Sequence, residues 1–88
     1  MNCDELMEKC REELRARYGG APGVTVLCEK ATDRRGWVCT AGVSRKGADG
    51  WAVFVFACGP TKGRAAARLA RLLGVAWEAG ATVEGLAR

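Results

Sequence analysis

Residues 51–73, with the sequence WAVFVFACGPTKGRAAARLARLL, decide the fold of this chain. The first eight are aromatic, β-branched or small apolar residues, as in a buried strand, and Gly59-Pro60 ends the run. From Arg64 onward, basic residues recur at positions 64, 68 and 71, while apolar residues mark the opposite side at helical spacing. The stretch therefore predicts a buried strand that leads directly into a helix, over residues 61–73, with one cationic face.

The predicted junction between strand and helix has the features of an anion site. Pro60 can begin a helix but cannot continue one, and the Thr61 hydroxyl can accept from the first N–H groups of the helix. Those N–H groups carry a partial positive charge, and Lys62 and Arg64 flank them. We therefore expect the junction to hold a phosphate.

The chain before this stretch begins with a predicted helix over residues 3–18. Its apolar residues form one stripe at helical spacing, and the charged residues lie outside the stripe. Asn2 and Glu5 have the spacing of a capping box, which marks a helix start. The glycine-rich segment 19–23 ends the helix.

Two strands are predicted between that helix and Trp51. Residues 24–30 and 37–45 alternate in side-chain character as a half-buried strand does. The polar segment 32–36 contains a glycine and predicts a hairpin connection, and a second turn follows at 46–50. The order of elements is α-β-β-β-α, which is an α+β fold with a three-stranded antiparallel sheet.

The length of 88 residues allows one domain with one modest core. We assign residues 1–74 to this domain, and residues 75–88, which are rich in alanine and glycine, to a C-terminal extension or tail. The apolar fraction of 49% and charged fraction of 27% are ordinary for a folded soluble protein. Because the first residues are polar and no apolar run is long enough to cross a bilayer, we expect neither a secretory signal nor a membrane partner.

The net charge of +4 belongs to the second part of the chain. Residues 1–18 carry five acids and four bases, whereas the remaining residues carry five acids and ten bases. Such an excess permits binding to nucleic acid, although a solvated surface explains it equally well.

Five cysteines lie at positions 3, 10, 28, 39 and 58 without any Cys-x-x-Cys pair, and histidine is absent. This pattern argues against a zinc site, so we expect no metal or cofactor, and reduced, half-buried thiols in a cytoplasmic or nuclear compartment. Without histidine, and with no acid and nucleophile at a spacing that the elements would bring together, the sequence does not favour an enzyme.

Residues 60–73, PTKGRAAARLARLL, directly after a third antiparallel strand, resemble the second helix of the double-stranded RNA-binding domain. In that family this helix begins with lysines and continues with alanines that let it lie close to the sheet. The resemblance covers about residues 3–73 and implies that both helices pack on one face of the sheet. It also implies recognition of duplex RNA by shape, across two minor grooves and the major-groove phosphates between them.

Carried over position by position, Lys62, Arg64 and Arg68 would stand in for the lysines that bind phosphates across the major groove. The family pattern is Lys-Lys-x-Ala-Lys, and Gly63 and Ala66 replace its other two lysines when Lys62 is taken as the first. The resemblance therefore implies phosphate binding with a reduced number of cations.

The resemblance also implies contacts to the two minor grooves. Arg34 and Arg35 would replace the segment between the first two strands, in which the histidine and proline common in the family are missing. On the first helix, Glu5, Glu8 and Glu12 are candidates to reach ribose 2′-hydroxyls, and Glu8 and Glu12 lie off the apolar stripe.

The basic residues Arg64, Arg68 and Arg71 have a simpler explanation than RNA binding, because a helix face that is exposed to solvent carries charged residues at the same spacing. The position of Lys62 and Arg64 at a helix start favours RNA contact over that alternative. Arg71 lies one or two turns from that end, and we expect it to be a bystander.

The predicted third strand carries large apolar residues on both faces. If Val53 and Val55 face the helices, Phe54 and Phe56 lie on the open face of the sheet, and the reverse arrangement exposes Trp51, Val53 and Val55. Either way an apolar patch remains, and such patches usually meet a partner. We expect Trp51, Phe54 and Phe56 to contribute to a protein interface of a homodimer, formed through the sheet or through the edge of the third strand. In a monomer, a tail that folds back through Trp77 and Leu86 would cover the same surface.

Two functions stay open. The first is non-catalytic binding of double-stranded RNA by shape, in RNA-processing machinery or, in a stand-alone viral protein, to sequester duplex RNA from host silencing or innate sensing. The second is a protein-interaction module that keeps the fold, has lost RNA binding, and acts by dimerisation or by binding a host or machinery protein. The order of elements also resembles the small proteins that bind the Alu domain of signal recognition particle RNA, where RNA lies against the sheet.

Overall fold

The computed structural model describes residues 2–18, 23–33, 35–44 and 51–75, with the backbone alone over 51–53. The elements are α1 (Cys3–Arg17), β1 (Val24–Lys30), β2 (Trp37–Ser44), β3 (Trp51–Gly59) and α2 (Lys62–Leu72). The strands form one antiparallel sheet in the order β1-β2-β3. The predicted α-β-β-β-α order is confirmed, and each boundary lies within one residue of its predicted place. The predicted turn at 46–50 and the tail beyond Val75 lie outside the described residues.

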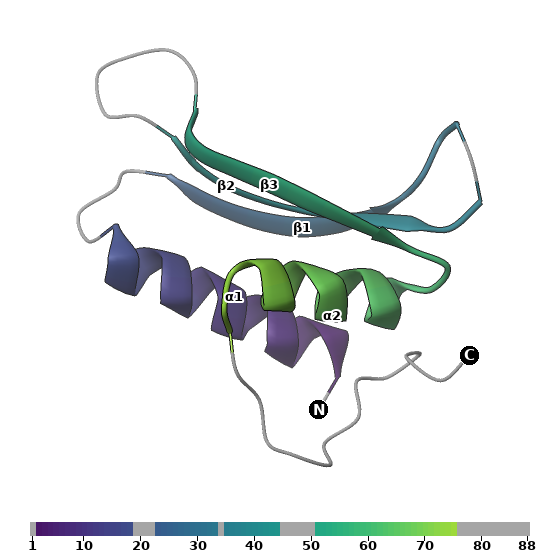
Figure 1. Ribbon diagram of the computed structural model, residues 1–88, viewed down its shortest axis with the longest axis horizontal. Coiled ribbons are helices and arrows are strands. Elements are labelled where there is room, and N and C mark those ends of the chain that lie inside the picture. Colours follow the sequence, from purple (N-terminus) through teal and green to yellow (C-terminus); the bar gives the residue numbers. More distant parts are fainter. Residues whose placement is uncertain (1, 19–22, 34, 45–50, 76–88) are drawn as a thin grey trace.

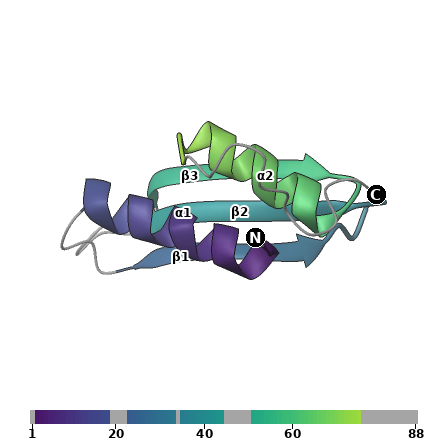
Figure 2. The same ribbon diagram turned by 90° about the horizontal axis from the view of Figure 1, so that it is seen from below.

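Both helices lie on the same face of the sheet, as Figure 1 shows. The α1 helix packs against β1, the α2 helix packs mainly against β3 and β2, and the two helices contact each other. Figure 2, seen from the helix side, shows them side by side in front of the strands. The fold is therefore one layer of helices and one layer of sheet.

The helix starts are capped as the sequence predicts. The Asn2 side-chain oxygen accepts from the Glu5 N–H at 2.8 Å, and Thr61 Oγ1 accepts from the Arg64 N–H at 3.1 Å. Each cap satisfies one of the N–H groups that a helix start leaves without an acceptor.

The end of α2 is a Schellman motif built on Gly74. The Gly74 N–H donates to the Arg71 carbonyl at 3.1 Å, and the Val75 N–H donates to the Ala70 carbonyl at 2.8 Å. Gly74 has a φ of 73°, which glycine adopts without the steric cost of a Cβ. Val75, the residue that follows Gly74, is buried in the core.

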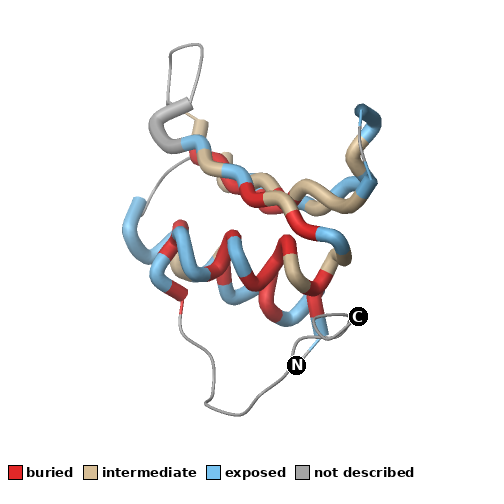
Figure 3. The backbone as a smooth tube through the Cα atoms, turned by 45° about the vertical axis from the view of Figure 1, so that its right-hand side comes forward, coloured by how far each residue is buried: buried red, intermediate tan, exposed pale blue. Residues whose placement is uncertain are grey.

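Small residues bring α2 close to the sheet. Its buried residues are Gly63, Ala65, Ala66, Ala67, Leu69 and Ala70. At the end of β3, a Cβ placed on Gly59 would lie 2.6 Å from the Ala65 nitrogen, so no larger residue fits there without movement. Figure 3 shows that the buried residues gather between the helices and the sheet.

The register of the sheet decides which residues of β3 face outward. Val55 packs against the core, whereas Phe54 and Phe56 are 52% and 57% exposed. Leu27 of β1 is also exposed, and Thr40 lies between Leu27 and Phe56 in the register. The first of the two predicted arrangements is therefore the correct one for Val55, Phe54 and Phe56, while the side chain of Trp51 lies outside the described residues.

A disulfide joins Cys28 of β1 to Cys39 of β2. The expectation that all cysteines are reduced is wrong for this pair, because the register places the two residues opposite each other on the helix-facing side. The Ser44 N–H donates to the Gly23 carbonyl, so these two residues form a hydrogen-bonded pair. Along an antiparallel pair of strands, hydrogen-bonded and non-hydrogen-bonded residue pairs alternate. Counted from Gly23 and Ser44, Cys28 and Cys39 form a non-hydrogen-bonded pair. At such pairs the strands come closest, and the Cα atoms here are 4.1 Å apart.

The remaining cysteines, Cys3, Cys10 and Cys58, are thiols, as expected from the sequence. Burial raises the pKa of Cys10 from 9.0 to about 11, and the charge of Arg11 acts in the opposite direction. Cys10 is therefore protonated at neutral pH and inert as a nucleophile.

Removal of the cross-strand disulfide is expected to lower the free energy of unfolding by roughly 2 to 3 kcal/mol, because the bond closes a short loop in the unfolded chain. Urea unfolding with and without a reductant measures the difference. The Cys58→Ala variant is the control and is expected to show the same dependence on reductant as the wild type. Identical unfolding midpoints in both conditions would contradict the prediction.

Candidate nucleic-acid interface

The start of α2 carries two cations and no acidic residue in its first turn. Thr61 is the N-cap, and its backbone carbonyl accepts from the Ala65 N–H at 3.0 Å. The N–H groups of Lys62 and Gly63 have no acceptor within the helix, as at any helix start. These are the elements of the anion site that the sequence predicts.

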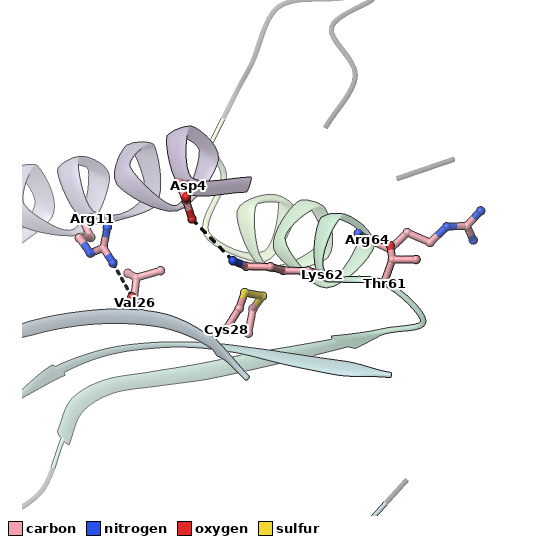
Figure 4. Close-up of a disulfide and its surroundings, with 8 residues drawn as sticks. Asp4, Arg11, Val26, Cys28, Thr61, Lys62 and Arg64 are labelled. Carbon is pink, nitrogen blue, oxygen red and sulfur yellow. Dashed lines mark hydrogen bonds and ion pairs between the residues drawn. A yellow bond between two sulfur atoms is a disulfide. The ribbon is translucent and has the colours of Figure 1, made fainter. Parts of the chain in front are cut away.

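The side chains of Lys62 and Arg64 nevertheless point in different directions, so their charged groups do not meet at one place. The Lys62 Nζ lies 3.6 Å from Asp4 Oδ1 at the start of α1. Figure 4 shows Lys62 directed toward Asp4 and Arg64 directed the other way, with the disulfide between helix and sheet. The Asp4 side chain is 85% exposed, and such surface ion pairs contribute about 0 to 1 kcal/mol. A phosphate can compete with this pair, but the resting position of Lys62 is toward α1.

Arg68 lies further along α2 and is held against the edge of the sheet. Its Nη1 donates to the Cys58 carbonyl of β3 at 2.7 Å. Among the described residues, Arg64, Ala67, Arg68 and Arg71 line a shallow hollow of about 260 Å³ on this side of the helix. Arg71, expected to be a bystander, therefore shares this surface with Arg64 and Arg68.

The hairpin between β1 and β2 lies next to the start of α2. Gly36 has a φ of 110°, and a Cβ placed on it would lie 2.5 Å from the Gly59 carbonyl oxygen and 3.5 Å from the Pro60 Cα. Arg35 is exposed in this hairpin, and Arg34 lies outside the described residues. The structure thus brings the hairpin with Arg35 to the same end of the fold as Lys62.

The glutamates predicted to reach ribose hydroxyls lie elsewhere. Glu8 is held by two arginines, with Arg11 Nη1 at 2.9 Å and Arg15 Nη1 at 3.5 Å. Arg11 also donates to the Val26 carbonyl of β1 at 2.7 Å, so Glu8 lies on the β1 side of the molecule. The strand order β1-β2-β3 separates it from Arg68, which lies at the β3 edge.

Glu12 is exposed on α1 and lies beside a hollow that Gly74 and Val75 also line. It is therefore close to the C-terminal end of α2, whereas Lys62 is at the N-terminal end. Neither Glu8 nor Glu12 is brought together with the cations of α2.

Two structural roles of arginine have no signal in the sequence. Arg11 and Arg68 lie outside the apolar stripes, yet each donates at 2.7 Å to a carbonyl of an outer strand. These two hydrogen bonds occupy acceptors on both edges of the sheet, where unpaired backbone groups invite pairing with other chains. Helical spacing alone does not tell which arginine reaches an edge, because that depends on how each helix lies on the sheet.

Comparison of the chain with protein-family models, with curated proteins and with solved structures gave no match. Over the part of the chain that the structure describes, no helix has the length and apolar character to cross a membrane. Within the same residues, no three acidic or cysteine side chains gather as metal ligands. What the site does must therefore be inferred from its geometry.

The Asp4→Asn variant is expected to raise the affinity for the duplex RNA that the sequence predicts by about two- to fivefold, because Lys62 loses its resting partner. Fluorescence anisotropy at low salt measures the affinity. Glu29→Gln, on the open face of the sheet, removes the same charge without touching Lys62 and is the control. An Asp4→Asn affinity that equals that of Glu29→Gln would contradict the prediction.

Proposed function

We propose that this protein is a non-catalytic binder of double-stranded RNA, with phosphate contacts on α2 and a groove contact from the hairpin that carries Arg35. The side of α2 with Arg64, Arg68 and Arg71 supports this most directly, because three guanidinium groups gather there and α2 contains no acidic residue. Guanidinium groups bind phosphate through two parallel hydrogen bonds and remain charged at any physiological pH.

The arrangement favours recognition of shape over base sequence. The inner side of α2 is buried against the sheet, so the helix presents its charged side and not a row of base-reading side chains. Phosphate contacts fix position without reading sequence, and A-form RNA is recognised largely through its shape, its phosphates and its 2′-hydroxyls. The nearby hairpin supplies a second point of contact at a fixed distance from α2.

Such a binder would act by covering duplex RNA. It would serve within an RNA-processing assembly or, as a stand-alone viral protein, sequester duplex RNA from silencing or innate sensing. Both roles use the same surface, so one binding experiment tests the activity that they share.

The test is a salt titration of binding to an RNA duplex of about 20 base pairs, with a DNA duplex of the same sequence alongside. We expect micromolar or tighter binding that prefers RNA. The Arg64→Ala/Arg68→Ala variant should bind more weakly, with the slope of log affinity against log salt reduced by about 0.9 for each lost contact.

Arg15→Ala is the control, because it removes a positive charge from the β1 side of the molecule, where Arg15 pairs with Glu8. Its salt slope is expected to stay close to that of the wild type. No binding at low salt, or a loss in Arg15→Ala as large as that in Arg64→Ala/Arg68→Ala, would contradict the proposed function.

A second candidate, a protein interaction through the open face of the sheet, is supported by a different observation. Phe54 and Phe56 are more than half exposed there, and Leu27 lies on the same face. Large apolar side chains that are exposed together on one face of a sheet often mark an interface. We propose that two copies of the chain associate through this face, whether or not RNA is bound. A host or machinery protein is the alternative partner for the same face.

Sedimentation of the wild type at high micromolar concentration is expected to give the mass of two chains, and the Phe54→Ser/Phe56→Ser variant the mass of one. Leu72→Ser, which changes an exposed apolar residue near the end of α2, is the control and should leave the mass unchanged. A wild-type mass of one chain would reject self-association through the sheet.

A further inference from the structure

The hollow on the side of α2 has the composition of a phosphate site. Arg64, Arg68 and Arg71 are spaced four and three residues apart, so they lie on one side of the helix, with rises of about 6 Å and about 4.5 Å between them. Ala67, which is 2% exposed, also lines the hollow.

Arg68 is positioned before any ligand arrives. Its hydrogen bond to the Cys58 carbonyl fixes the guanidinium at the edge of β3. A guanidinium has five N–H donors, so this bond leaves others for a ligand. Because the side chain is already ordered, less conformational entropy is lost when it binds an anion.

Lys62 does not belong to this group in the resting protein. Its ammonium lies beside Asp4, toward α1, while the arginine hollow opens on the side of α2. The cations of α2 therefore divide into Lys62, paired across the two helices, and the arginine row Arg64, Arg68 and Arg71.

We propose that the arginine row holds a backbone phosphate of duplex RNA in this hollow, and that Arg71 is one of its direct ligands. The principal phosphate contact thus lies along the side of α2 and not at its first turn with Lys62. This inference rests on the proposed function for the identity of the ligand, while the chemistry that it names is a phosphate group held by charge-assisted hydrogen bonds.

The test compares two single variants that each remove one positive charge from α2. Arg71→Ala is expected to weaken RNA binding by about five- to tenfold and to reduce the salt slope by about 0.9. Lys62→Ala is expected to weaken it less than twofold. Arg71→Lys should recover only part of the loss, because an ammonium cannot form the paired hydrogen bonds of a guanidinium. Arg71 is exposed, so these variants are expected to fold, which circular dichroism checks.

A larger loss in Lys62→Ala than in Arg71→Ala would overturn the inference and leave RNA binding intact. A second measurement, titration with inorganic pyrophosphate followed by the side-chain N–H resonances of the arginines, applies even when RNA does not bind. Saturable shifts of Arg64, Arg68 and Arg71 that disappear in Arg71→Ala would then support the phosphate site and reject only the RNA ligand. An absence of shifts at the arginine row would overturn the inference.

Discussion

The close approach of α2 to the sheet is the constraint on which the rest of the structure depends. It exists because the buried residues of the helix are glycine and alanine apart from Leu69, and because Gly59 leaves room for the backbone at Ala65. With small residues inward, the charged residues of the helix must lie along its sides and outer surface. The same approach brings Arg68 within 2.7 Å of the Cys58 carbonyl. The packing of α2 on the sheet and the position of its cationic surface thus both follow from the small residues on the inner side of the helix.

The two helices secure opposite edges of a small sheet. Arg11 reaches β1 and Arg68 reaches β3, so each outer strand has one carbonyl occupied by a side chain from the helix layer. The cross-strand disulfide holds β1 against β2, and the packing of α2 holds β2 and β3. Arg68 consequently has a structural and a proposed binding role. Loss of RNA binding in an Arg68 variant therefore identifies a contact only when the stability of the variant is measured as well.

Local signals explain why much of the fold could be predicted from the sequence. The caps at Asn2 and Thr61, the stop at Gly74 and the helical spacing of the arginines all act within a few residues. The partners of Cys28 and Lys62 could not be predicted, because they depend on strand register and on how α1 lies against α2. The outward direction of Phe54 and Phe56 stayed open for a related reason, since a strand that is apolar on both faces carries no alternation to read.

The central claim is that the ligand lies on the helix side of the molecule and not on its open sheet face. Backbone amide shifts of the isotope-labelled protein, recorded as an RNA duplex is added, test it most directly. We predict that shifts gather along residues 62–71 and in the hairpin at 31–36, with the open face around Phe54 and Phe56 unaffected. Shifts centred on Phe54 and Phe56, with the side of α2 unchanged, would contradict the account and assign RNA binding to the sheet.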